Sequence, residues 1–269
     1  CLAMLTACVQ KERSQNTSVL HTSHYEIGNV MRVDSTEVLE RVKTERRADL
    51  DSFLVDVDTF ISRDTLLAAN CDWYCLKTLN DIDAKLNCDI QIDLPSSNSW
   101  HVNTEIKREL FSQRDKFLEE LNQLRIQKDP FVMDNSYRSE FRVRLLSAHR
   151  DSSITSFCFS VDAYTAAAPH EMPMLYSFNF DTRTNRRVTF DDVFDIETQE
   201  DSLLLIELIK TSFSQCNLHL PRVYEFDFNM SNDYLIFNFD AYEITGYVWG
   251  TPRIPLNKEA ILRRFGKTG

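Results

Sequence analysis

His170, Tyr242 and Glu243 are the residues of this chain whose types could support acid–base or metal chemistry, provided that the fold brings them together. An imidazole beside a carboxylate can transfer protons or bind a metal ion. His170 follows a proline in the segment Tyr164-Thr-Ala-Ala-Ala-Pro-His170, where a single solvated loop residue is the favoured interpretation. Glu243 ends an aromatic strand, so we expect it to be partly buried and to fix a turn by accepting amide hydrogen bonds, rather than to act in catalysis.

Other catalytic patterns are weak. Asp191 and Asp192 form a carboxylate pair, but at the start of a helical turn we interpret them as helix caps. His21 and His24 are the only closely spaced histidines. The sequence has no Gly-x-Ser-x-Gly elbow, phosphate-binding glycine loop or His-Glu-x-x-His motif. We therefore expect no cofactor or metal. Two carboxylates placed for glycoside cleavage remain an open alternative, because their separation is set by the fold.

The elements expected to position these residues include both helices and strands. Residues 34–63 and 103–129 carry apolar residues at helical spacing, with Asn103 or Thr104 as cap of the second helix. Residues 86–94 alternate as a half-buried strand. Further strands are expected at 140–148, 154–164 and 174–181, and further helices at 200–215 and 257–265. Residues 224–228 and 235–239 form a hairpin. Short turns between strands predict an α+β fold with a mainly antiparallel sheet, packed helices and two subdomains.

The aromatic hairpin leads into the most distinctive segment of the chain, Tyr242-Glu-Ile-Thr-Gly-Tyr-Val-Trp-Gly250, followed by Ile254-Pro-Leu256. Together with the pattern Tyr-x-Phe-Asn-Phe-Asp then Thr-Phe-Asp-Asp-Val-Phe at residues 176–194, this segment resembles the extracytoplasmic domain of unknown function shared by RsiV-type anti-sigma factors and PdaC-type envelope proteins. The resemblance covers residues 85–265. Gly246 and Gly250 are expected to permit sharp turns. The candidate ligand-binding residues are Tyr164, His170, Tyr242, Glu243, Tyr247 and Trp249.

The resemblance has a departure and several implications. Family members carry glycines before the histidine, where this chain has Ala166, Ala167 and Ala168, and alanine disfavours the positive φ of a tight loop. RsiV-type members recognise lysozyme, a basic protein. PdaC-type members add a deacetylase domain, which needs a metal-binding Asp and two spaced histidines. Since His21 and His24 are the only closely spaced pair and lie near the tether, we expect no second domain of that kind in this sequence. The resemblance therefore implies recognition rather than turnover.

Composition limits the class of partner. The chain has 269 residues, of which 43% are hydrophobic and 11% aromatic, enough for a sizeable core. Asp and Glu total 41 against 30 Lys and Arg, so the formal charge is −11. This charge disfavours nucleic acid and anionic membrane surfaces and suits a cationic partner, although many acidic domains are charged only for solubility. Since no apolar run approaches the roughly 20 residues of a membrane span, we expect attachment to a membrane only through a lipid.

The N-terminal segment predicts that lipid. Leu5-Thr-Ala-Cys8 resembles the end of a bacterial lipoprotein signal, in which the cysteine accepts a diacylglycerol, and a polar tether follows it. The segment has no initiating methionine or basic region, so we expect the printed chain to begin inside the signal. A chance match in a buried strand is the alternative. Lipidation at Cys8 would place the protein in the bacterial cell envelope, extracytoplasmic.

The other cysteines leave the disulfide pairing open. Cys71 and Cys75 form one Cys-x3-Cys pair, which is weak evidence for zinc, and a local disulfide or two small buried side chains are favoured. The remaining candidates for pairing are Cys88, Cys158 and Cys216. An odd number of cysteines leaves one thiol over in any complete pairing.

These observations predict a domain organisation and a function. The domains are a lipoprotein signal remnant (1–8), a polar tether (9–18), a helix-rich region (19–84) and the two halves of the recognised domain (85–150 and 151–269). We predict an envelope-anchored, non-catalytic binding lipoprotein that recognises a protein, such as a basic lysozyme-like one, or a peptidoglycan-type glycan. The alternative is a cell-wall glycan hydrolase or deacetylase with an unrecognised carboxylate or histidine site.

Overall fold

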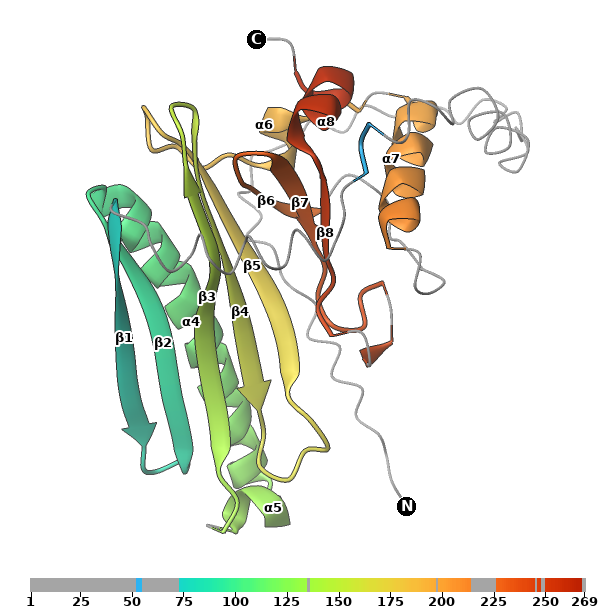
Figure 1. The fold of residues 1–269 in the computed structure, drawn as a ribbon. Helices are drawn as coiled ribbons and strands as arrows, with labels where there is room; N and C mark the ends of the chain where they lie inside the picture. The colour runs from blue at the N-terminus through green and yellow to red at the C-terminus, as the bar shows by residue number, and fades with distance from the viewer. Residues whose placement is uncertain are drawn as a thin grey trace, which may run out of the picture.

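Two sheets of unequal size form the frame of the molecule. The structure is a computed structural model that describes residues 52–54, 73–134, 136–196, 198–213, 226–244, 246–247 and 250–267. A five-stranded sheet stands beside a three-stranded one, with a long helix across the larger sheet and shorter helices around the smaller (Figure 1). This arrangement confirms the predicted α+β fold with a mainly antiparallel sheet.

The elements follow the chain in two groups. The larger group comprises β1 Tyr74–Asp83, β2 Cys88–Ser97, α4 Trp100–Ile126, α5 Pro130–Met133, β3 Ser139–Arg150, β4 Ile154–Tyr164 and β5 Met172–Asp181. The smaller group comprises α6 Phe190–Val193, α7 Gln199–Ser212, β6 Asp227–Met230, β7 Tyr234–Asn238, β8 Arg253–Asn257 and α8 Lys258–Phe265. Each sheet keeps the chain order of its strands. Only β2 and β3 are parallel, because α4 and α5 connect them.

Helix α4 covers one face of the larger sheet with the apolar stripe that its sequence predicts. Its buried residues are Val102, Ile106, Leu110, Phe117 and Leu121. The helix begins earlier than expected, because the side chain of Ser99 accepts the amide of Val102 and serves as the cap. Asn103, one of the two predicted caps, instead bonds both backbone groups of Ser97 and fixes the turn after β2.

Strand β1 is a correction to the sequence analysis, which placed these residues in the helix-rich region 19–84. Its apolar residues Leu76, Leu79 and Ile82 recur every three positions, as on a helix, and all three are exposed. Since this edge strand is exposed on both faces, it lacks the alternating pattern that marks a half-buried strand. Most of the predicted first helix lies outside the described residues. Phe53, predicted on its apolar face, lies in a turn and packs in the core of the smaller sheet.

Each sheet has its own hydrophobic core, which confirms two subdomains. Phe157, Phe159 and Phe178 lie in the core under α4. The core of the smaller sheet contains the predicted hairpin, in which Phe228 pairs with Phe237 and the Phe226 ring packs on Phe237 and Phe239. Tyr224, predicted in the same hairpin, lies outside the described residues.

A polar seam joins the two sheets. It consists of Ser147, Ser156, Ser177 and Asn179 from the larger sheet and Asn229, Asn238 and Arg253 from the smaller. The Asn179 amide donates to the Phe228 carbonyl at 2.7 Å, and the Asn238 amide donates to Ser177 Oγ at 2.8 Å. Because these buried groups satisfy one another, the seam avoids the cost of orphaned donors and acceptors.

The described cysteines divide by burial. Cys88 and Cys158 are buried, and Cys75 is exposed on β1. Burial, followed by the charges of Asp83 and Asp89, raises the pKa of the Cys88 thiol to about 12, so this side chain remains a neutral apolar group. Cys71 and Cys216 lie outside the described residues. None of the described helices is both long and apolar enough to span a membrane.

Candidate functional site

Three of the predicted site residues meet in one aromatic cluster, which consists of His170, Tyr242 and Tyr247. The His170 and Tyr247 rings stack with centroids 3.8 Å apart and planes at 23°. The Tyr242 ring lies 5.6 Å from Tyr247 at 28°. His170 belongs to the β4–β5 loop, whereas both tyrosines belong to the β7–β8 connection, so the cluster joins loops of the two sheets.

His170 is held more firmly than a solvated loop residue, which was the favoured interpretation. Its Nδ1 lies 2.9 Å from the Glu171 carbonyl oxygen, and its Nε2 lies 3.2 Å from the Tyr242 hydroxyl. A carbonyl only accepts, so Nδ1 carries the proton in the neutral ring and Nε2 accepts from Tyr242. Both ring nitrogens therefore orient the imidazole, and neither contacts a carboxylate.

Two residues in or near the cluster have left-handed backbone conformations. Tyr242 has φ +67° and Ala167, three residues before His170, has φ +60°. Such conformations cost roughly 1–2 kcal/mol for a residue with a Cβ, so the surrounding contacts impose them. The alanine loop thus forms the turn that its lack of glycine put in doubt. Gly250 has φ +64° and turns the chain as predicted, whereas Gly246 does not have a positive φ.

Glu243 and Asp240 brace the tyrosine segment. A carboxylate oxygen of Glu243 accepts the amide of Asp240 at 2.8 Å, which is the turn-fixing contact that the sequence predicted, although Glu243 is exposed rather than partly buried. Asp240 Oδ1 in turn accepts the amide of Leu175 on β5 at 2.6 Å. The segment is therefore tied to the larger sheet immediately before Tyr242.

Of the other two predicted residues, only Tyr164 lies in the described part of the chain. Tyr164 ends β4, pairs in register with Glu140 on β3 and is half-buried. The structure gives no contact between Tyr164 and the three rings. Trp249 lies outside the described residues.

The surface around the cluster is apolar, acidic and open. The Tyr242 side chain is 52% exposed, and Met172, two residues after His170, is 42% exposed. Slight burial and the charge of Glu171 raise the pKa of the Tyr247 phenol, so this group is neutral at physiological pH. Two hollows, of about 650 Å³ along α4 and about 740 Å³ beside β1, β2 and β3, are lined by other residues. At the cluster itself, Tyr242 is the ring that is open to solvent.

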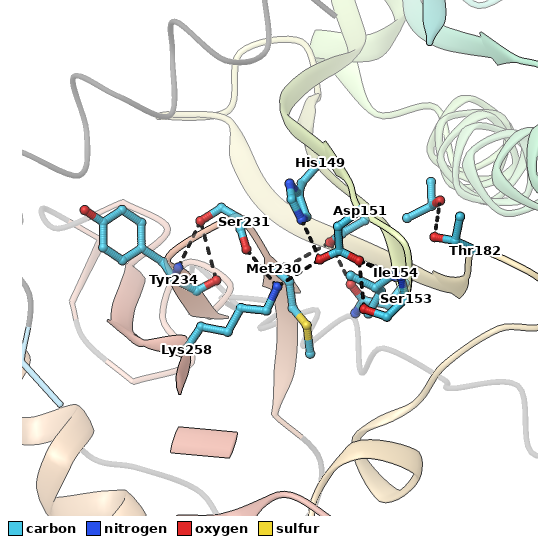
Figure 2. A network of polar contacts seen from close by, with 12 residues as sticks. His149, Asp151, Ser153, Ile154, Thr182, Met230, Ser231, Tyr234 and Lys258 are labelled. Atoms are coloured by element: carbon cyan, nitrogen blue, oxygen red, sulfur yellow. Dashed lines mark hydrogen bonds and ion pairs between the residues drawn. The ribbon is translucent and has the colours of Figure 1, made fainter. Parts of the chain in front are cut away.

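A second histidine lies in a polar network that the sequence analysis missed, at the opposite end of β4. Figure 2 shows His149, Asp151 and Lys258 pointing toward one another. His149 Nε2 and Lys258 Nζ each lie 3.1 Å from the same Asp151 oxygen. The other Asp151 oxygen accepts from the amides of Ser153 and Ile154 at 2.7 and 2.8 Å. The sequence Asp-Ser-Ser after a strand signals this turn, but not its partners.

The members of this network shift one another's pKa values. Burial lowers the pKa of His149, the hydrogen bond that the imidazole donates to Asp151 opposes this change, and the charge of Lys258 lowers the pKa further. Burial would raise the pKa of Asp151, but the amides of Ile154 and Ser153 and the Ser153 hydroxyl hold it well below its usual range. Lys258 Nζ also donates to the Ser231 carbonyl at 3.1 Å. These contacts clamp the β3–β4 turn to the β6–β7 turn and α8.

Neither histidine is placed for the chemistry that was considered. Within the described ranges, no hydroxyl or thiol nucleophile is hydrogen-bonded to His149, and no three His, Cys, Asp or Glu side chains gather as a metal site. Asp192, part of the predicted carboxylate pair, accepts the Thr189 amide at 2.9 Å and caps α6, whereas Asp191 is exposed. The described geometry brings His170, Tyr242 and Tyr247 together, with Tyr242 exposed.

Comparison with known proteins gives structural neighbours but no sequence match. No family model matches the chain, and no curated protein matches its sequence. A solved structure of a DUF3298 family protein from Pseudomonas aeruginosa PAO1 is similar, with a TM-score of 0.47, 15% identity and coverage of 73% of this chain and 95% of that one. A DUF3298 member from Bacteroides fragilis NCTC 9343 gives a TM-score of 0.48 and 13% identity, covering 72% and 93%. These two solved structures are thus neighbours of this chain at low identity.

Proposed function

We propose that this chain is a non-catalytic recognition domain of the bacterial cell envelope, and that the aromatic cluster contacts a basic protein. The observation that carries the proposal is the near-parallel stacking of His170 on Tyr247 and of Tyr247 on Tyr242, in which Tyr242 is exposed and held at positive φ. Rigid aromatic side chains provide contact area at low cost in conformational entropy.

The residues beside the cluster favour a protein partner. Aromatic and methionine side chains are enriched at protein interfaces, and Met172 extends the apolar surface beside His170. Tyrosine is also a frequent hot-spot residue. Exposed side chains such as Tyr242 and Met172 suit contact with a protein surface, whereas a small ligand is usually enclosed in a concave pocket.

Charge favours a basic partner. Glu171 and Glu243 flank the rings in sequence, and the whole chain carries a formal charge of −11. Such a field steers a cationic protein toward the surface and speeds association at low salt. Recognition of lysozyme by RsiV-type proteins, which the aromatic segment resembles, supports the same class. A peptidoglycan-type glycan is the second outcome that the binding experiment distinguishes.

The experiment compares binding by three variants. The purified chain is immobilised and exposed to lysozyme, as a basic protein probe, and separately to soluble peptidoglycan fragments. We expect lysozyme to bind, and Tyr242→Ala or Tyr247→Ala to weaken binding about tenfold or more. Trp100→Ala is the matched control, because Trp100 is 78% exposed on α4, near the end of the sheet that carries His149.

The outcomes separate the possible functions. Binding of the fragments but not of lysozyme, lost with the same tyrosines, would replace the protein by a glycan. Release of sugars or acetate from the fragments would overturn the non-catalytic proposal. Equal binding by all variants would remove the aromatic cluster from the contact surface.

We also propose a lipid anchor at Cys8, supported by the pattern Leu5-Thr-Ala-Cys8. Metabolic labelling with a lipid precursor in a bacterial host is expected to mark the wild-type chain, expressed with a complete signal, but not Cys8→Ala. The two chains are also expected to differ in membrane fractionation. Absence of label, or equal labelling of both, would contradict the anchor.

A further inference from the structure

We propose that two copies of this chain pair through β1 in an antiparallel, two-fold arrangement that continues the larger sheet from one copy to the other. The occupant of the β1 edge is therefore a second copy. The proposal goes beyond ligand recognition, and it rests on the exposure of β1 and on the match of this strand to itself.

β1 is an open edge among the residues that the structure describes. It pairs with β2 along ten residues and ends the strand order of the sheet. Eight consecutive residues, Cys75 to Ile82, are exposed. Leu76, Leu79 and Ile82 are 48%, 43% and 58% exposed. A long edge of this kind is a template for pairing with another strand.

Symmetry restricts the registers. In a continuous antiparallel sheet, residues that face each other lie on the same side of the sheet. A two-fold axis between the two β1 strands must therefore lie level with one residue, which then faces its own copy. We call this the axis at that residue. With the axis at Leu79, Leu79 faces its own copy. Residues one, two and three positions before Leu79 then face those one, two and three positions after it.

That register matches the side chains from Leu76 to Ile82. Lys77 faces Asp81 of the second copy, twice, on the side of Leu79. On the other side, Leu76 faces Ile82 and Thr78 faces Asn80. Opposite charges, apolar pairs and hydrogen-bonding pairs at directly facing positions all stabilise a sheet. Asp81 already accepts the amide of Ile82 at 2.8 Å, but a carboxylate has acceptor sites left for a lysine.

Neighbouring registers lack the match. An axis at Thr78 places Lys77 opposite Leu79 and Leu76 opposite Asn80. An axis at Asn80 places Leu79 opposite Asp81. An axis at Lys77 places two lysines face to face. The match at Leu79 is therefore specific to that register.

The charges also argue against a purely protective role. Edge strands often carry charged residues that repel a second strand. Charges of one sign repel in any antiparallel register that brings them face to face. Lys77 and Asp81 have opposite signs and lie at equal distances from Leu79, so they attract in the register that pairs the apolar residues.

Charge exchange tests this register. Sedimentation of the full chain over a concentration series is expected to give a dimer. In Lys77→Asp, an aspartate at position 77 faces Asp81 of the second copy. In Asp81→Lys, a lysine at position 81 faces Lys77 of the second copy. Each variant alone is therefore expected to raise the dissociation constant of the dimer about tenfold or more. An equimolar mixture of the two restores both attractive pairs and is expected to dimerise again. Both sites are exposed, so circular dichroism and the melting temperature are expected to match the wild type.

A cross-link tests the axis. In a Cys75→Ser background, Leu79→Cys places two thiols face to face and is expected to give a disulfide-linked dimer on a non-reducing gel. Thr78→Cys is the matched control, and we expect it to form no disulfide-linked dimer because position 78 faces Asn80. A wild-type chain that remains monomeric throughout the series would overturn the proposal. Dimerisation that persists in Asp81→Lys, or cross-linking equal at the two positions, would equally exclude this pairing.

Discussion

The two ends of β4 hold the two histidines in opposite ways. At one end, the His149 side chain is 10% exposed and shares a carboxylate with Lys258. At the other end, His170 stacks on Tyr247 and bonds Tyr242, whose ring is half exposed. The β4 strand separates the ends by roughly 30 Å or more. Both sites join the two sheets, but only the second also faces solvent.

The comparison shows that clustering of polar and aromatic residues does not by itself define a ligand site. Around Asp151, backbone and side-chain donors engage both carboxylate oxygens, so the group is committed to the fold. Around Tyr242, the hydroxyl is engaged while the ring face is exposed. We call the end of β4 near His149 and Asp151 the closed end, and the end near His170 and Tyr242 the open end. We assign stability mainly to the closed end and propose recognition for the open end.

The largest expected effect is on stability at the closed end. Asp151→Asn removes the charge that Lys258 and His149 share, and we expect the free energy of unfolding to fall by about 2–3 kcal/mol. Asp191→Asn makes the same change at an exposed carboxylate and is expected to cost a few tenths of a kcal/mol. Urea titration of both variants measures the difference. Equal losses would remove the distinction between the ends.

The next effect is on recognition at the open end. Tyr242→Phe keeps the ring but removes the hydroxyl that orients His170, so we expect a loss of binding smaller than the tenfold or greater loss of Tyr242→Ala. Titration of lysozyme against each variant compares the affinities, and urea titration checks that the fold is retained. If Phe and Ala weaken binding equally, the hydrogen bond rather than the ring face controls the contact.

Acidification is expected to weaken the closed end. The folded state holds the pKa of His149 below its ordinary value of 6.5, mainly through burial. The unfolded chain therefore takes up a proton first as pH falls through 6.5, and stability decreases below that pH. The pKa of Asp151 is also lowered in the folded state, so this residue adds a further loss of stability only as pH falls below its ordinary pKa of 3.8. Urea titrations of wild type and His149→Gln at about pH 7.5 and about pH 5.5, roughly 1 unit above and below the ordinary value of 6.5, test this difference. The wild type should decline more than the variant.

The smallest effect concerns the loop before His170. Ala167 has a positive φ, so Ala167→Gly is expected to raise the melting temperature slightly, by relieving strain worth about 0.5–1 kcal/mol after the entropy of glycine is subtracted. Ala168, next in the chain, has no positive φ, and Ala168→Gly is expected to lower stability by about 0.5–1 kcal/mol. Shifts of the same sign in both variants would contradict the strained loop.

The sequence predicts the parts of the fold in which one face is buried. Ile106, Leu110 and Phe117 mark α4 because their helical spacing meets a sheet. The alternating phenylalanines mark the hairpin because its core face is apolar. β1 has no buried face and therefore lacks the alternating pattern that would have marked it as a strand.

The candidate site is predicted in its residues but not in its contacts. Tyr242 and Tyr247 stand out because their aromatic segment is unusual, and Glu243 fixes the turn that its position suggested. The stack on His170 depends on two loops more than 70 residues apart, at residues 170 and 242–247, and no local pattern encodes that approach. The same reason hides Lys258 as the partner of Asp151, 107 residues away.

The polar seam has a consequence for how a partner meets this molecule. If the small sheet shifted by one residue, the side-chain amides of Asn179, Asn229 and Asn238 would lose their hydrogen-bond partners. Each loss would reduce the free energy of unfolding by about 1–3 kcal/mol. The loop of His170 and the segment of Tyr242 therefore hold one preset spacing. A partner must fit that spacing on arrival, and changes in the partner's contact surface should alter how long the complex lasts more than how fast it forms.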